Sequence, residues 1–303
     1  MNWKKEGLFF CPKGEYPWML SHASLPIADF VEDDIFRIYF SSRNSQNYSS
    51  IGYIEIDLKS PKNILTISEN PIISPGKLGS FDDTGAMTAS IVTHEAKKYL
   101  YYIGWNQSTT VPFRWSIGLA ISTDDGISFQ KFSEGPIMDR NYIDPYFVSS
   151  PTVIKEGNIW KMWYISGISW QKTDEKLYIP YNIRYAESSD GIHWNRNGKF
   201  CLDFKNSKET RIGRASVLKT DNKYQIWYSY AASSYRIGYA ESDNGISWIR
   251  KDNLAGIDVS KSGWDSQMIE YSYVFKHKDE MYMLYNGNNY GETGIGLAKL
   301  IFN

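Results

Sequence analysis

The stretch IGYAESDNGISWIR (237–250) decides the fold, because it recurs along the chain. Two close copies read IRYAESSDGIHWNR (183–196) and IGLAISTDDGISFQK (117–131), and two shorter ones read IGYIEIDL (51–58) and IGLAKL (295–300). In the long copies a short alternating strand leads into an Asp-Gly or Asn-Gly turn, followed by Ile, a polar residue and an aromatic residue. Such a turn between two alternating runs predicts a β-hairpin, because these residues tolerate a positive φ.

A second phrase precedes each copy and reads as an apolar strand, a polar turn and an aromatic-rich strand. It occupies residues 21–42, 87–106, 148–167, 213–232 and 269–288. The five occurrences align on Ser24, Ser90, Pro151, Ser216 and Ser272, in steps of 66, 61, 65 and 56 residues. Five units of four short strands predict an all-β protein, a five-bladed β-propeller with four-stranded blades.

The whole chain, 1–303, is expected to form this single domain. The predicted blades cover approximately 15–75, 80–139, 142–203, 207–257 and 263–303. The N-terminal WKKEGLFF (3–10) resembles WNRNGKFC (194–201), which follows the turn of the copy at 183–196. We therefore expect residues 3–10 to supply the fourth strand of the last blade and to close the ring. A β-sandwich is the alternative, and five phased copies argue against it.

Composition excludes several classes of protein. Lys plus Arg is 33 and Asp plus Glu is 34, so a net charge of −1 offers no electrostatic footprint for nucleic acid. No apolar run suits a signal peptide or a membrane span, and a cytoplasmic protein without membrane insertion is expected. Cys11 and Cys201 are too few for a disulfide scaffold or a zinc site. No cofactor is predicted; a structural calcium ion in the channel and the oligomeric state stay open.

Polar residues mark the start of each predicted innermost strand, two positions before the alignment points. They are His22, Thr88, Ser149, Arg214 and Glu270. Burying such groups is costly unless they pair or face a wet cavity. Two interpretations follow: an Arg214–Glu270 pair across the channel, or a polar funnel for a polar ligand.

Acidic residues form a second column five positions earlier, at Asp83, Asp144, Glu209 and Asp265. They could cap turns in every blade or take part in chemistry. Aromatic residues are frequent in the loops of the same face, where function usually concentrates. They include Trp105, Trp115, Trp170, Tyr178, Tyr235 and Tyr290. Aromatic platforms beside carboxylates and amides suit sugars, which present apolar C–H faces and hydroxyl edges.

The sequence resembles the five-bladed propeller glycosidases. The features that carry the resemblance are the five-fold repeat and the segments YAESSDGIHW, GSFDDTGAMTASIV and SGWDSQMIEYSYVF. These form the arabinanase, levansucrase and invertase superfamily, with glycoside hydrolase families 43 and 32 and related mannoside phosphorylases. The resemblance covers the whole chain. It implies hydrolysis by carboxylates that project into the channel, one protonated and one ionised.

The chain departs from that pattern at three positions, because Ala23, Ala89 and Ser149 stand where the resemblance implies catalytic acids. The usual triad cannot be carried over. The predicted catalytic residues are Glu270, as general acid, with Asp83, Asp144 and Asp265. The predicted substrate-binding residues are His22, Arg43, Thr88, Trp105, Asn106, Ser149, Trp170, Glu209, Arg214, Tyr271, Asn286 and Asn288.

The leading hypothesis is a glycoside hydrolase-like enzyme that cleaves or transfers a glycosyl unit. Its partner would be a carbohydrate, including polysaccharide, or a nucleotide-linked sugar, since arginines on the face can recognise phosphate. Alternatives are a glycosyltransferase or phosphorylase of surface-glycan metabolism, a glycan-binding propeller without catalysis, and a protein-interaction propeller. Ala23 and Ala89 favour a binder, whereas the acids on the face favour an enzyme.

Overall fold

The computed structural model describes residues 1–174, 177–220 and 223–301. Strands account for nearly all of its regular structure, so the all-β class is confirmed. The helical elements within these ranges are two short turns, η1 (Asp252–Leu254) and α1 (Asn288–Gly291). None of the helices in the described part of the chain could cross a membrane.

Antiparallel pairing groups most described strands into five sets of four. The first set is β2 (Ser21–Glu32), β3 (Ile35–Arg43), β4 (Ser49–Asp57) and β5 (Ile64–Ile67). The second is β6 (Gly85–His94), β7 (Lys97–Gln107), β8 (Phe113–Ser122) and β9 (Gln130–Lys131). The third is β10 (Val148–Glu156), β11 (Ile159–Gly167), β14 (Tyr181–Ser188) and β15 (Asn195–Leu202).

The fourth set is β16 (Arg211–Lys219), β17 (Tyr224–Ala231), β18 (Tyr235–Ser242) and β19 (Ile249–Arg250). The fifth is β20 (Glu270–His277), β21 (Glu280–Asn286), β22 (Ile295–Leu300) and the N-terminal β1 (Trp3–Phe10). A small hairpin of β12 (Gln171–Lys172) and β13 (Leu177–Tyr178) lies apart from these sets.

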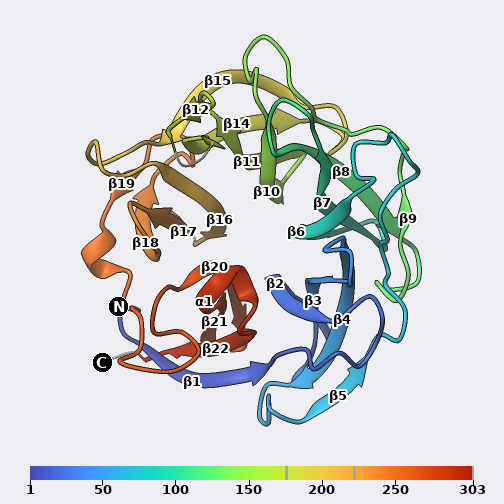
Figure 1. Cartoon of the computed structure of the whole chain (residues 1–303). Coiled ribbons are helices and arrows are strands. Elements are labelled where there is room, and N and C mark those ends of the chain that lie inside the picture. The colour runs from blue at the N-terminus through green and yellow to red at the C-terminus, as the bar shows by residue number, and fades with distance from the viewer. Residues whose placement is uncertain (175–176, 221–222, 302–303) are drawn as a thin grey trace.

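The sets surround a common centre, with β2, β6, β10, β16 and β20 innermost (Figure 1). Single parallel bridges join neighbouring sets at Ser49–Gly85 and at Tyr181–Arg211. The two ends of the chain meet in the fifth set, where β1 pairs antiparallel with β22 from Trp3–Leu300 onward. The innermost strands of all five sets therefore lie around the same central region.

The recurring Asx-Gly turn joins the second, third and fourth sets each to the set before it. The carbonyl oxygens of Gly126 and Gly191 accept hydrogen bonds of 2.8 Å from the hydroxyls of Tyr39 and Tyr101, which lie on the preceding set. The turn glycines have positive φ, 76° at Gly191, and a Cβ there would lie 2.8 Å from the Tyr101 hydroxyl. Glycine is thus required both by the turn and by its close contact.

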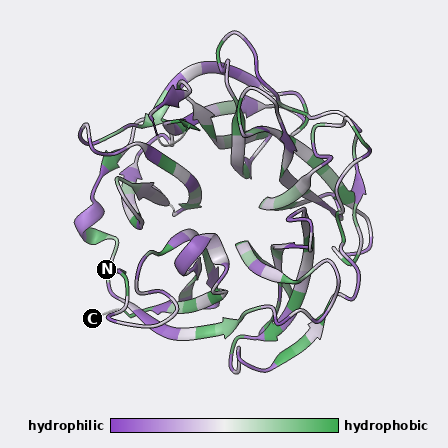
Figure 2. Cartoon of the chain, viewed as in Figure 1, coloured by the Kyte–Doolittle hydropathy of each residue, from purple (hydrophilic) through white to green (hydrophobic). Residues whose placement is uncertain are grey.

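The fifth set lacks this turn, and the N-terminus takes its place. In the fourth set the Gly245 carbonyl accepts a 2.6 Å hydrogen bond from the Trp163 indole. The equivalent Trp227 instead meets the edge of Trp3, with ring centroids 6.0 Å apart. Trp227 is fully buried in an apolar cluster that also contains Leu300. Figure 2 shows such apolar segments distributed among the strands of all sets.

Candidate active site

Each innermost strand is irregular where it begins, at the predicted polar column. The ladder register shifts between Ser149 and Thr152, between Gly213 and Ala215, and at the corresponding points of the other sets. Left-handed φ values occur there at His22, Ser150, Arg214 and Tyr271. Bulges re-aim side chains, and bulky residues with positive φ are rare and concentrate at functional sites.

The Arg214 side chain does not pair with Glu270, so that interpretation of the polar column is wrong. Its guanidinium is buried and donates to two backbone carbonyl oxygens, at Ala89 (2.5 Å) and Pro26 (3.3 Å). Burial lowers the pKa of Arg214 to about 10. Arg214 therefore ties the fourth set to the first two across the centre, and its predicted role in substrate binding is not supported by this position.

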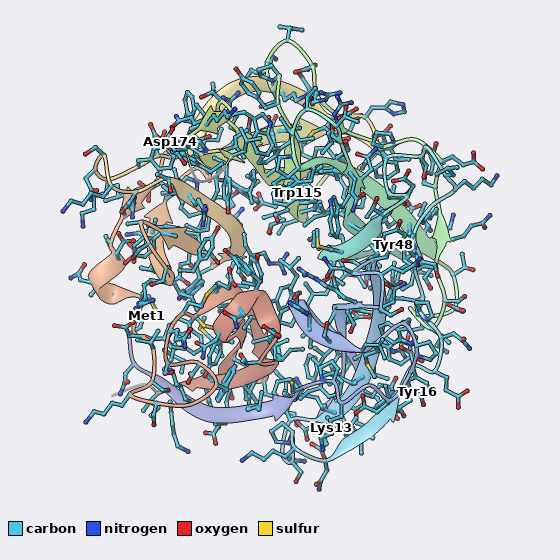
Figure 3. All side chains as sticks on the ribbon, viewed as in Figure 1. Met1, Lys13, Tyr16, Tyr48, Trp115 and Asp174 are labelled. Carbon is cyan, nitrogen blue, oxygen red and sulfur yellow. The ribbon has the colours of Figure 1, made fainter. Side chains whose placement is uncertain are left out.

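An aromatic cavity of about 350 Å³ opens beside these irregular strand ends. Its aromatic walls are Trp105, Phe113, Trp115, Trp170, Tyr178, Tyr181, Tyr235, Tyr271 and Tyr290. Its polar lining includes Arg43, Ser149, Ser150 and Arg211. Trp115 is labelled in Figure 3. The segment between β11 and β14 contributes Trp170 and Tyr178, and its residues 175–176 lie outside the described ranges.

Glu270 is the buried acid next to this cavity. Its side chain is 0% exposed, and neither carboxyl oxygen makes a hydrogen bond of good geometry within the described residues. Burial raises the pKa of Glu270 well above its usual range, and contacts with Tyr271 and Arg211 offset only part of that rise. Desolvation of this kind favours the neutral, protonated form of a carboxyl.

Tyr271 connects Glu270 to the cavity. The two residues are adjacent in sequence, and a bulge at this point of β20 breaks the alternation that would send them to opposite faces. Tyr271 has φ 55°, lines the cavity and is close enough to the Glu270 carboxyl to affect its pKa. Burial and the neighbouring Glu270 in turn raise the pKa of Tyr271.

Two more tyrosines and one arginine complete the surroundings of Glu270. The hydroxyls of Tyr181 and Tyr235 share a short hydrogen bond. The Arg211 guanidinium lies 5.8 Å from the centroid of the Tyr235 ring. This cluster draws on β14, β16, β18 and β20, so the fold brings together residues from three sets.

None of the predicted acid column lines this cavity, and its members Asp144, Glu209 and Asp265 are buried. Asp144 is 0% exposed and accepts 3.0 Å hydrogen bonds from both Arg184 and Arg196, besides the Tyr164 hydroxyl at 2.9 Å. Asp265 pairs with Lys5 at 2.7 Å and accepts from Tyr285 at 3.1 Å. Both carboxylates have their charge balanced within their own set.

Glu209 and Asp82 follow the same design. Glu209 forms a two-point ion pair with Arg250, at 2.7 and 3.1 Å, which places it in structure rather than in substrate binding. In the second set the equivalent acid is Asp82, whose carboxylate accepts hydrogen bonds from the Lys131 ammonium group and the Tyr102 hydroxyl. The predicted Asp83 is one residue away and accepts from Gly79 N–H and the Thr84 hydroxyl.

Several other predicted binding residues also serve the scaffold. The Asn286 amide donates to the Ala23 and Gly294 carbonyls and accepts from Leu25 N–H. Thr88 donates to the Leu25 carbonyl, and Asn288 caps the loop that precedes β20. The remaining predicted residues outside the cavity lining are His22 and Asn106.

His22 lies close to the cavity lining at Arg43. Burial, followed by the charge of Arg43, lowers the pKa of His22 to about 4. Its ring nitrogen lies 2.9 Å from the Ser21 hydroxyl. His22 is therefore neutral near pH 7, which leaves Arg43 as the cation on this side of the cavity.

Of the predicted site residues, the structure brings Arg43, Trp105, Ser149, Trp170 and Tyr271 together around the cavity, with Glu270 behind. Sequence reasoning placed Arg211 and Tyr235 on the face but omitted them from the site. It did not single out Phe113 and Tyr181, which lie at the starts of β8 and β14. Within the described residues, no group of three or more His, Cys, Asp or Glu side chains is arranged to hold a metal ion.

Comparison with known proteins places the chain in a family. No family model matches it. Two Mycobacterium tuberculosis proteins, the uncharacterized proteins MT1551 and Rv1502, are each 44% identical to it over 301 residues, 99% of this chain and of theirs. The chain belongs to their family.

Solved structures of glycoside hydrolases have the same fold. One glycoside hydrolase superposes with a TM-score of 0.76 at 18% identity, over 99% of this chain and 92% of that one. The catalytic domain of the Coprinopsis cinerea GH62 α-L-arabinofuranosidase gives 0.68 at 12%, over 98% and 96%. A thermostable family-43 glycoside hydrolase gives 0.69 at 13%, over 93% and 91%. The resemblance predicted from the sequence is confirmed as a shared β-propeller fold.

Proposed function

We propose that this chain is a carbohydrate-active, glycoside hydrolase-like enzyme whose active site is the aromatic cavity, with Glu270 as its general acid. One observation carries the proposal: Glu270 is a fully buried carboxyl without a good hydrogen-bond partner among the described residues, directly behind the cavity wall. Such a group costs folding free energy. A raised carboxyl pKa beside a cavity is typical of groups that donate protons in catalysis.

The cavity suits a sugar ring. Trp105, Trp115 and Trp170 offer flat apolar faces, against which the C–H faces of a pyranose or furanose can pack. Ser149 and Ser150 supply hydroxyl groups for its edges. A mostly apolar pocket with a few polar groups of this volume is typical of small-ligand sites.

Proton delivery would run through Tyr271, because this residue touches both the cavity and Glu270. As the glycosidic bond breaks, the Tyr271 hydroxyl gives its proton to the departing oxygen and takes the proton of the Glu270 carboxyl. The resulting Glu270 carboxylate is stabilised by the nearby Arg211 charge. Water or an acceptor hydroxyl then adds to the anomeric carbon and gives its proton to the Tyr271 hydroxyl oxygen, while the Tyr271 proton returns to the Glu270 carboxylate.

The scheme uses one carboxyl instead of two. None of the described residues that line the cavity is an Asp or a Glu, in line with Ala23, Ala89 and Ser149 in the chain. We also propose that the five strand sets are the blades of a closed five-bladed ring. The pairing of β1 with β22 and the contact of Trp3 with Trp227 support that closure.

The test is a turnover screen of the purified protein with aryl glycosides and short oligosaccharides, each with and without phosphate. Glu270→Gln is compared with Glu209→Gln, the same change at another buried glutamate. We expect Glu270→Gln to lower turnover about 10²- to 10⁴-fold, and Glu209→Gln to leave the turnover of folded protein unchanged. Equal turnover in wild type and Glu270→Gln, or no turnover with any substrate alongside measurable sugar binding, would overturn the proposal.

A further inference from the structure

We infer that the sugar bound in the cavity carries a negatively charged group, a phosphate or a carboxylate, held between Arg43 and Arg211. The inference deepens the proposed function and rests on it for the sugar, but not for the anion. Both arginines line the cavity, at the end of β3 and the start of β16. They therefore approach it from the first and the fourth strand sets.

No acid among the described residues pairs with either arginine, unlike most of the enclosed arginines. Arg37 pairs with Glu55 at 2.7 Å, Arg250 pairs with Glu209 at 2.7 Å, and Arg184 pairs with Asp144 at 3.0 Å. No ion pair with a carboxylate reaches Arg43 or Arg211 in the ranges 1–174, 177–220 and 223–301. A partly buried guanidinium without a counter-ion is costly, and an anionic ligand would supply that counter-ion.

Arg43 holds its guanidinium at the cavity with a neutral partner. It donates to the side-chain carbonyl oxygen of Asn47, at 3.0 Å. Burial lowers the pKa of Arg43, and the charges of Tyr271 and Glu292 act against that shift. The Glu292 side chain is exposed and accepts from the Asn289 amide at 3.1 Å, so it makes no direct contact that would neutralise Arg43 within the described residues.

Arg211 lies against Tyr235 and close to Glu270. Neither carboxyl oxygen of Glu270 forms a hydrogen bond or an ion pair with this guanidinium in the described part of the chain. Among the described residues, the cavity is thus lined by two guanidinium groups and by no carboxylate, which leaves a surplus of positive charge inside aromatic walls. Guanidinium groups bind phosphate and carboxylate by paired hydrogen bonds, and these are stronger in a site shielded from water.

The arrangement also links binding to chemistry. A bound anion adds negative charge near Glu270, and a like charge favours the protonated carboxyl. The anionic group of the ligand would therefore keep the proposed acid in its active form. A neutral sugar would lack both this effect and the ion pairs.

The experiment measures binding through the tryptophan fluorescence of the cavity walls, with calorimetry as a second readout. Ligands are hexose 1-phosphates (gluco, galacto and manno), the matching uronates, neutral methyl glycosides, and inorganic phosphate alone. Proteins are the full chain, Arg43→Gln, Arg211→Gln and the control Arg114→Gln. Arg114 lies on β8 with an exposed side chain and does not line the cavity.

We expect at least one anionic sugar to bind about tenfold or more tightly than its neutral counterpart. Arg43→Gln and Arg211→Gln should each weaken that binding about 10- to 100-fold, with Arg114→Gln unchanged. The phosphate and uronate series show which anion the site prefers. Circular dichroism establishes that each variant is folded.

Three results would overturn the inference. The first is that neutral and anionic sugars bind equally tightly, and the second is that no anion changes the fluorescence or the heat of binding. The third is that inorganic phosphate binds at the same time as a neutral sugar, since the anion would then not be part of the sugar. Loss of turnover is not among them. Anionic sugars that bind through both arginines without being turned over would remove the proposed enzyme function and leave this inference standing.

Discussion

Two kinds of buried acid occur in this molecule. Asp82, Asp144, Glu209 and Asp265 lie in the loops before the innermost strands, and each is paired with a Lys or Arg of its own set. Glu270 lies at the start of an innermost strand and has no such partner among the described residues. The paired acids connect the beginning of a set to a strand farther out in it, whereas no ion pair connects Glu270 to another strand within the described residues. The paired acids therefore stabilise the fold, whereas the burial of Glu270 destabilises it.

The physics of burial explains why that difference matters. A buried carboxylate with charged partners is costly to break, because removing one partner leaves the other charge uncompensated. A buried carboxyl without charged partners lowers the stability of the folded protein, because its burial removes it from water without compensation. Substitution should therefore have opposite effects on stability at the two places, even where the chemical change is the same.

The largest effect is expected for Asp144→Asn. The change removes the charge that balances both Arg184 and Arg196, which are nearly buried. We expect the free energy of unfolding to fall by about 3–5 kcal/mol, measured by urea denaturation. A loss below about 1 kcal/mol would mean that the pairing contributes no more than an exposed salt bridge, and the comparison would fail.

Tyr271→Phe should follow, as a change in chemistry rather than in fold. It removes the hydroxyl that connects Glu270 to the cavity, so turnover should fall about 10²-fold, or about 2.7 kcal/mol. Because contact with Tyr271 lowers the pKa of Glu270, the alkaline limb of any remaining activity should move to higher pH. A pH–rate profile checks this, and an unmoved limb would separate Tyr271 from Glu270.

Glu209→Gln should have a smaller effect on stability. Arg250 loses a two-point ion pair but keeps Asp252, at 2.9 Å. We expect a loss of about 1.5 kcal/mol or more in the free energy of unfolding. Thermal denaturation beside Glu270→Gln provides the measurement. Equal losses in both variants would show that the two glutamates contribute to stability in the same way.

The fold could be predicted because the repeat encodes contacts that recur from set to set. Gly126 and Gly191 each accept a hydrogen bond from an aromatic residue of the preceding set, and such a periodic contact leaves a periodic signature. The N-terminal match to a fourth strand was readable for the same reason. The acid column could also be predicted from the repeat. In the second set, however, the prediction named Asp83, whereas the acid that is paired in the structure is its neighbour Asp82.

The site was harder to predict, because it depends on the departures from the repeat. A bulge with positive φ at Tyr271 and Arg214 decides where the neighbouring side chains point, and spacing alone does not reveal it. Whether an acid is paired depends on residues far away in sequence, as with Asp265 and Lys5. Glu270 was identified from its column, but its lack of a partner could be seen only in three dimensions.

The most direct test of the account compares the unfolding free energy of wild type and Glu270→Gln as pH rises from about 4 to about 8. The folded-state pKa of Glu270 lies above its unfolded value of 4.5, so the folded protein holds a proton that the unfolded chain releases. Wild-type stability must then fall with rising pH, relative to the variant.

We predict that wild type loses stability relative to Glu270→Gln as the pH rises, so that the variant is the more stable protein at about pH 8. A variant that is less stable than wild type at both pH values would show that the Glu270 carboxyl supports the fold, and would contradict the account.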